Sequence, residues 1–129
     1  MEWILLLGRV LFGGFFVMGG AMHFMKLHDM TEYARMKGAP MPKLATIVTG
    51  MVIMLAGLGI VFGIYQAWAL LAIAAFLVVI TPIMHAFWKV SDPNMKMMEM
   101  QMFLKNMALL GAALALYVFS SNWPFSLTF

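Results

Sequence analysis

Four long apolar runs constrain the fold of this chain more than any other feature of its sequence. They span about residues 3–25, 44–63, 67–88 and 97–120, and each is close to the roughly 20 apolar residues that a transmembrane helix needs. Only 10% of the 129 residues are charged, against about 25% in an average water-soluble domain. The sequence therefore predicts an all-α protein, a bundle of four antiparallel transmembrane helices that forms one domain over residues 1–129.

A polar segment after the first run predicts a short additional helix. Within residues 26–43, Thr31 is of the type that caps a helix N-terminus. The expected helix is amphipathic, spans Thr31–Lys37 and lies along the membrane surface. We expect its Tyr33 and Met36 to face the lipid.

Short connections and small residues predict which helices are neighbours. The connection at residues 64–66 is so short that the second and third helices must be antiparallel neighbours. Gly59 and Gly63 form a GxxxG pair in the second helix, and Gly50 and Gly57 add small-residue surface. Such residues let two helix backbones approach closely in a membrane.

Cationic side chains are concentrated in the first and third loops. Cytoplasmic loops of membrane proteins carry an excess of lysine and arginine, so we expect these loops in the cytoplasm and both termini outside, in a multi-pass protein of the cell (inner) membrane. Arg9 lies inside the first helix, near the opposite side. We expect it to be structural, either snorkelling to the near interface or donating hydrogen bonds between helices. The loop cations are Lys26, Arg35, Lys37, Lys43, Lys89 and Lys96.

This topology brings polar side chains from several runs to one end of the bundle. Polar and charged groups inside a membrane are costly and are usually kept for a partner or a function. Glu99 shares a helix face with Asn106, and Gln101 shares another with Lys105. We expect Glu99 and Gln101 to have structural roles. The candidate ligand-binding residues are His23, His85, Trp88, Lys105 and Asn106.

Two interpretations of this polar cluster remain open. Imidazole, ammonium and amide groups can donate hydrogen bonds to the carbonyls of a quinone, and Trp88 with Phe87 could stack on its ring. Alternatively, the polar groups satisfy one another and the loop backbone, because such groups often link helices within a membrane.

Other chemistries have weaker support. The chain has no cysteine, which excludes disulfides and thiolate metal sites. Its 16 methionines and its histidines suit Cu(I), but methionine is also an ordinary filler of apolar contacts, and no metal ligands are predicted. A small transporter or channel would require a homo-oligomer, because the helix cores are nearly free of charge and lack broken-helix repeats. The acidic residues and serines are scattered and form neither a carboxylate pair nor a Ser-His-acid arrangement, so we predict no catalytic residues.

The chain resembles the DoxX family of small four-helix membrane proteins along nearly its whole length. Its most distinctive match is the run FLKNMALLG at residues 103–111. One difference concerns the second helix, where many relatives carry a glutamate before a glycine pair and this chain has no acid. The other matching residues are Gly8, Arg9, Gly20, His23, Phe24, Tyr33, Ala34, Gly38, Pro40, Gly57, Gly63, His85, Phe87, Trp88, Asp92 and Pro93.

The resemblance implies a role in membrane redox chemistry. Family members resemble the small membrane subunit of thiosulfate:quinone oxidoreductase, and others look like membrane partners of redox or stress-defence enzymes. We therefore expect an accessory subunit of a membrane redox assembly, with no catalytic activity alone. A quinone is the candidate cofactor of such an assembly. Its expected partners are the lipid bilayer, a membrane or peripheral redox protein, and further copies of the chain.

Overall fold

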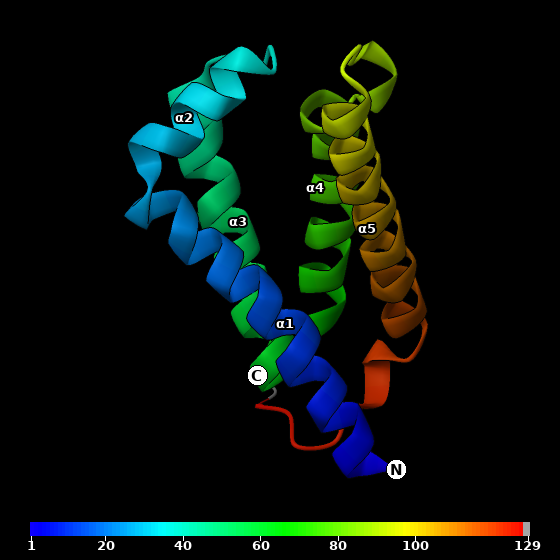
Figure 1. Cartoon of the computed structure of the whole chain (residues 1–129). Coiled ribbons are helices and arrows are strands. Elements are labelled where there is room, and N and C mark those ends of the chain that lie inside the picture. Colours follow the sequence, from blue (N-terminus) through cyan, green and yellow to red (C-terminus); the bar gives the residue numbers. More distant parts are fainter. Residues whose placement is uncertain (128–129) are drawn as a thin grey trace.

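The computed structural model describes residues 1–127 and is helical along most of this length (Figure 1). Four of the described helices, α1, α3, α4 and α5, are long and apolar enough to cross a membrane, which confirms the predicted all-α, four-helix architecture. The short helix α2 and two 3₁₀ turns, η1 and η2, lie between or after them. The bounds are α1 Glu2–Met25, α2 Leu27–Met36, α3 Pro42–Phe62, α4 Gln66–Met84, η1 Phe87–Lys89, α5 Pro93–Val118 and η2 Ser120–Asn122.

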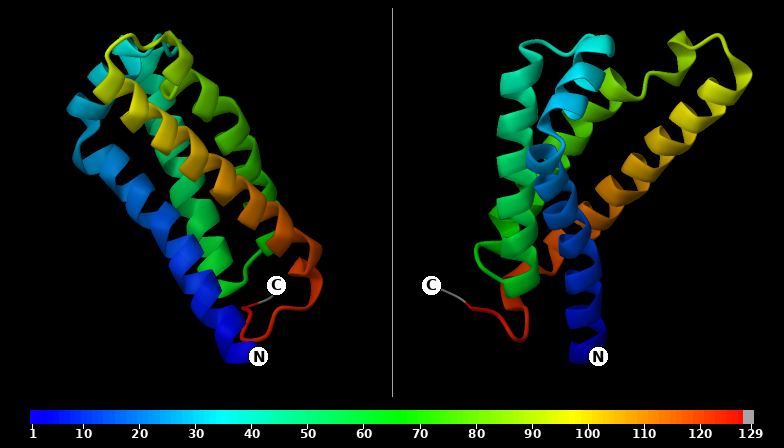
Figure 2. Two further views of the ribbon diagram at one scale, coloured as in Figure 1. Left: turned by 45° about the vertical axis from the view of Figure 1, so that its right-hand side comes forward. Right: turned by 60° about the vertical axis from the view of Figure 1, so that its left-hand side comes forward.

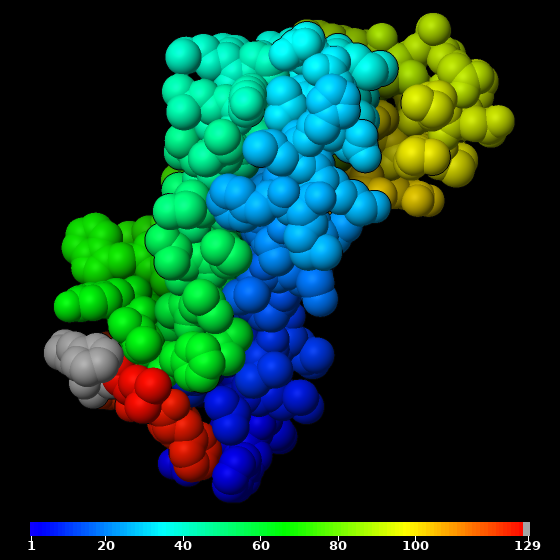
Figure 3. Space-filling model, turned by 90° about the vertical axis from the view of Figure 1, so that its left-hand side faces the viewer, coloured from blue at the N-terminus to red at the C-terminus, as the bar shows by residue number. Residues whose placement is uncertain are grey.

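The long helices form two closely packed pairs. Helix α1 packs along α3, α4 packs along α5, and α3 with α4 joins the two pairs. The pairs separate toward the end of the molecule that holds α2 and η1 (Figures 1 and 2). From the side, the beginning of α5, drawn in yellow, projects beyond α2 (Figure 3). The first and third loops therefore share one end, and the N-terminus lies at the other, as the topology predicts.

Two pairs of glycines bring α1 and α3 together. A Cβ atom built on Gly57 would lie 2.6 Å from the carbonyl oxygen of Gly13, and one on Gly20 would lie 2.7 Å from that of Gly50. Both are closer than real Cβ atoms approach other atoms, so these positions require glycine. The expected contacts of Gly50 and Gly57 are thus confirmed, and they arise because α1 and α3 run antiparallel with their backbones touching.

The predicted pair of Gly59 and Gly63 divides into two roles. Gly59 packs against α4, since an added Cβ would lie 3.3 Å from Cβ of Ala69, but Gly63 is not a helix-packing residue. Gly63 ends α3 in the left-handed conformation, with φ of 69°, which glycine adopts without a steric penalty. Gly59 faces the same turn, where an added Cβ would lie 2.8 Å from the carbonyl oxygen of Ile64. Gly59 thus allows the tight connection to α4, and Gly63 ends α3 beside Ser126 of the C-terminal segment.

Three helix ends differ from the prediction. Helix α2 begins at Leu27, so Thr31 is a buried interior residue rather than a cap. Helix α4 ends at Met84, soon after Pro82, and not at residue 88. Helix α5 begins at Pro93 because the carboxylate of Asp92 accepts a hydrogen bond from the backbone N–H of Met95 at 3.0 Å, which satisfies a free donor of the first turn.

Arg9 is fully buried and makes the hydrogen bonds between helices that were the second of its two expected roles. Its guanidinium donates to the carbonyl oxygens of Ile60 and Val61, at 3.2 and 3.0 Å, and to those of Pro124 and Phe125. Carbonyls in the last turn of a helix lack intrahelical partners and carry partial negative charge. They therefore attract the guanidinium, which ties α1 to α3 and to the C-terminal segment.

Candidate functional site

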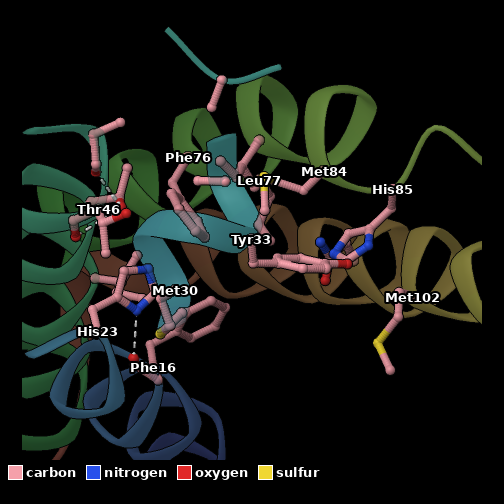
Figure 4. Close-up of a pocket in the computed structure, with 18 of the residues that line it drawn as sticks. Phe16, His23, Met30, Tyr33, Thr46, Phe76, Leu77, Met84, His85 and Met102 are labelled. Atoms are coloured by element: carbon pink, nitrogen blue, oxygen red, sulfur yellow. Dashed lines mark hydrogen bonds between the residues drawn. The ribbon is translucent and has the colours of Figure 1, made fainter. Parts of the chain in front are cut away.

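A cavity of about 320 Å³ lies where the two helix pairs separate. Helix α2 packs against α3 and contributes to its wall (Figure 4). Most of the wall is apolar, with Phe16 from α1, Ile53 from α3, and Phe76 and Leu77 from α4. The polar side chains that reach the cavity are His23, Tyr33, Thr46, Thr49, His85, Lys105 and Asn106.

Glu99 is the centre of the polar network beside this cavity. It lies on α5 and is only 5% exposed. One carboxylate oxygen accepts hydrogen bonds from the Tyr33 hydroxyl at 3.0 Å and from the Lys37 ammonium at 2.8 Å. The other oxygen lies 2.8 Å from Nδ1 of His85. A buried carboxylate needs such partners to offset the loss of its hydration, and here they link α2 and the turn after α4 to α5.

The network determines which protons two hydrogen-bond donors, His85 and Tyr33, carry. An ionised carboxylate only accepts hydrogen bonds, so Nδ1 of His85 carries the proton that faces Glu99. Burial, and then the hydrogen bond and negative charge of Glu99, raise the pKa of Tyr33 to about 12. Tyr33 therefore remains a neutral phenol and a hydrogen-bond donor near neutral pH.

The structure brings four of the five candidate ligand residues to one cavity: His23, His85, Lys105 and Asn106. Trp88 is not among the residues that line it. Its side chain is 52% exposed, and its ring packs edge-on against Phe87 and Phe103 at 5.3 and 5.8 Å. The cavity is therefore formed without Trp88, which lies in the 3₁₀ turn η1 after the end of α4, and the stacking of Trp88 on a bound ring stays a prediction.

Two of the lining residues also make hydrogen bonds of their own, one within a helix and one between two helices. Nδ1 of His23 lies 2.7 Å from the carbonyl oxygen of Gly19, and the Asn106 amide donates to the Thr81 hydroxyl at 3.2 Å. Lys105 makes only weak contacts, with a sulfur atom and an aromatic ring. Its ammonium is 5.4 Å from the centre of the Phe15 ring and 3.6 Å from the Met102 sulfur. Of the groups around the cavity, Lys105 and the second nitrogen of His85 are thus the best placed to meet a ligand.

The two residues expected to be structural behave differently. Glu99 is the buried hub, whereas Gln101 is exposed and makes no side-chain hydrogen bond within residues 1–127. Sequence reasoning missed two partners of Glu99. Tyr33 was expected to face the lipid, and Lys37 only to add loop charge. Their spacing of four residues, which puts both on one side of a helical turn, was the available signal.

Three methionines, Met30, Met84 and Met102, line the cavity together with His23 and His85. No group of three or more histidine, cysteine or acidic side chains in the described part of the chain could hold a metal ion. The ammonium of Lys105 beside the Met102 sulfur repels a cation at that ligand.

Comparison with known protein families identifies the family of this chain. The DoxX family model matches residues 4–86, more than half of the chain. The chain belongs to the DoxX family. The match covers α1 to α4 and ends before Glu99 and the FLKNMALLG run, so the assignment depends on the first four helices. No curated protein and no solved structure matches this DoxX protein.

Proposed function

We propose that this DoxX-family protein is an accessory subunit of a membrane redox assembly and that its cavity binds the headgroup of a quinone. The observation that carries the proposal is the cavity itself, apolar and partly aromatic, with a few polar groups from α1, α2, α4 and α5. Its volume of about 320 Å³ is near the lower end of the roughly 300–1,000 Å³ typical of small-molecule sites.

The polar groups offer complementary hydrogen bonds to the two redox states of such a headgroup. Because Nδ1 of His85 faces Glu99, Nε2 of the neutral ring is an acceptor, suited to a quinol hydroxyl. The ammonium of Lys105 is a donor suited to a quinone carbonyl. Phe16 and Phe76 supply aromatic surface for the ring.

The accessory role is supported by the kind of groups that surround the cavity. These residues offer hydrogen bonds and apolar contacts that would hold and orient a headgroup. In the proposed assembly, a redox partner that docks on this protein exchanges electrons with the bound headgroup. Membrane partnership with redox enzymes is also what the family resemblance implies.

The test combines purification with ligand binding. The protein is purified in mild detergent, its companions and bound small molecules are identified by mass spectrometry, and a short-chain quinone is titrated into it. Lys105→Met should weaken quinone binding by about tenfold or more, because a hydrogen bond from a charged group is worth about 1.5–3 kcal/mol. The matched control is Lys96→Met, an exposed lysine on the same helix, which should leave binding unchanged.

Three results would together refute this proposal: no quinone binding, no co-purified quinone and no redox companion. Equal weakening by Lys105→Met and Lys96→Met would instead indicate a general effect of charge and count against the assigned site.

Cu(I) binding is a second candidate, favoured by the three methionines and two histidines that line the cavity. Thioether and imidazole ligands suit this ion. Elemental analysis after copper loading, with Met84→Leu as the variant, tests it. Stoichiometric copper that the variant loses would support this candidate, and copper-free protein would remove it.

A further inference from the structure

A second apolar feature lies on the lipid-facing side of the same helices. Two adjoining depressions of about 580 and 340 Å³ follow the seam between α3 and α4, and both are lined by Val52 and Ala72. Together they form a groove, here called the α3–α4 groove. Its lining extends along α3 from Thr49 to Phe62 and along α4 from Trp68 to Ile80.

The α3–α4 groove has the length and chemistry of a site for an extended hydrocarbon chain. On α3 its lining runs from Thr49 to Phe62, a helical stretch of about 20 Å. Alanines and Gly59 contribute much of the lining, and larger apolar side chains such as Leu55 supply the rest. At one end stand Tyr65 and Trp68, which are 65% and 73% exposed, as is typical of aromatic residues at a membrane interface.

The other end of the groove meets the cavity. Thr49, Phe76 and Ile80 line both the cavity and the α3–α4 groove, and all three are half-buried. Figure 4 shows Phe76 and its neighbour Leu77 among the side chains around the cavity. A single layer of side chains thus separates the inner cavity from the outer groove.

We infer that the α3–α4 groove holds the apolar tail of the molecule whose headgroup binds in the cavity. The ligand class is then a cyclic carbonyl compound with a long alkyl or isoprenoid chain, which passes between α3 and α4 at Phe76 and lies along the groove. This inference rests on the proposed function and specifies its ligand. A partner helix fits the observations less well, because it cannot follow the inward continuation from the groove to the cavity.

The groove acts as a route more than as a source of affinity. Lipid chains are about as apolar as leucine side chains, so a tail gains little by leaving the bilayer for the groove. A tail whose route is blocked, however, prevents its headgroup from seating. Forcing it past an added ring resembles overpacking a core, which corresponds to a loss of affinity of about tenfold or more.

The experiment compares a tailed and a tail-less quinone on the whole protein in lipid nanodiscs. Ala72→Trp fills the groove where its two depressions join. Val78→Trp is the matched control, because Val78 lies on the same helix, is 55% exposed and does not line the groove. We expect Ala72→Trp to weaken binding of the tailed quinone by about tenfold or more, with the tail-less quinone unaffected and the control unchanged for both.

A measurement on the unmodified protein keeps the inference testable if Ala72→Trp misfolds. A quinone with a photoreactive group at the end of its tail should cross-link to groove residues such as Leu55 and Phe62. Cross-links on α1 and α5 would overturn the inference, since the tail would then leave through the space between those helices. Equal binding of the tailed quinone to both variants would also overturn it.

The results separate failure of this inference from failure of the proposed function. If the tail-less quinone binds to the cavity and loses affinity in Lys105→Met, the headgroup site stands whatever happens to the tail. If the unmodified protein binds neither quinone, the proposed function fails and the groove has no ligand to receive. Loss of a protein complex in Ala72→Trp, with unchanged quinone binding, would assign the groove to a partner helix instead.

Discussion

Replacing Glu99 by glutamine should loosen the link between α2 and the α4–α5 pair. Glutamine keeps the size of the side chain and an acceptor for Tyr33, but it removes the charge that faces Lys37 and His85 at 2.8 Å each. Removing one partner of a buried ion pair costs about 3–5 kcal/mol. The Lys37 and His85 side chains are 21% and 16% exposed, so water recovers part of this loss, and we expect unfolding to require about 2–3 kcal/mol less.

Reversible unfolding in mixed detergent micelles measures this free energy. Glu32→Gln is the matched control, because it removes the charge of a carboxylate that pairs with a cation at the surface. Glu32 and Arg35 of α2 lie 2.9 Å apart, and their side chains are 44% and 60% exposed. An exposed pair of this kind contributes about 0.5 kcal/mol or less. If Glu99→Gln cost no more than Glu32→Gln, the buried carboxylate would not be the group that joins the two halves, and the reasoning would be refuted.

Three further perturbations test other parts of the structure. Arg9→Met should destabilise the protein by about 2 kcal/mol or more, because it leaves carbonyl groups without a donor. Faster proteolysis of the C-terminal segment would show that this segment is released. Unchanged proteolysis would contradict the link between Arg9 and that segment. Gly57→Ala should cost about 1–3 kcal/mol through its clash with α1, whereas Gly8→Ala, with nothing within 4 Å of an added Cβ, should be neutral or stabilising; equal effects in thermal unfolding would show that α1 and α3 do not touch there. Tyr33 should ionise at a pH of about 12, so its hydrogen bond to Glu99 should stabilise the fold fully below pH 10, the ordinary pKa of tyrosine, and lose that effect as the pH rises through 12. The difference in tyrosinate absorbance between the wild type and Tyr33→Phe measures this, and ionisation near pH 10 would contradict it.

The fold was predictable because lipid imposes a simple rule. A chain that crosses the hydrocarbon region must satisfy its backbone hydrogen bonds internally, so apolar runs of sufficient length become helices. Short connections then decide which ends lie together. This is why the meeting of His23, His85, Lys105 and Asn106 around one cavity could be anticipated from topology.

The details of the site depended on rotations and turns that hydropathy does not specify. Tyr33 faces Glu99 because α2 begins at Leu27 and packs on α3, and its orientation follows from that contact. Trp88 lies away from the cavity because α4 ends at Met84, four residues before the predicted limit. Apolar composition alone predicts neither a helix's rotation nor its last residue.

The cavity itself follows from unequal packing among the helices. Glycines at Gly13, Gly20, Gly50 and Gly57 let α1 approach α3 until backbone atoms touch, which draws α1 toward α3 and away from α5. Helix α5 packs on α4 instead, so space remains between the two pairs. A buried carboxylate then has to bridge that space, and Glu99 does so with donors from α2 and from the turn after α4. Backbone contact between α1 and α3 and the Glu99 network across the opening therefore frame the cavity from its two sides.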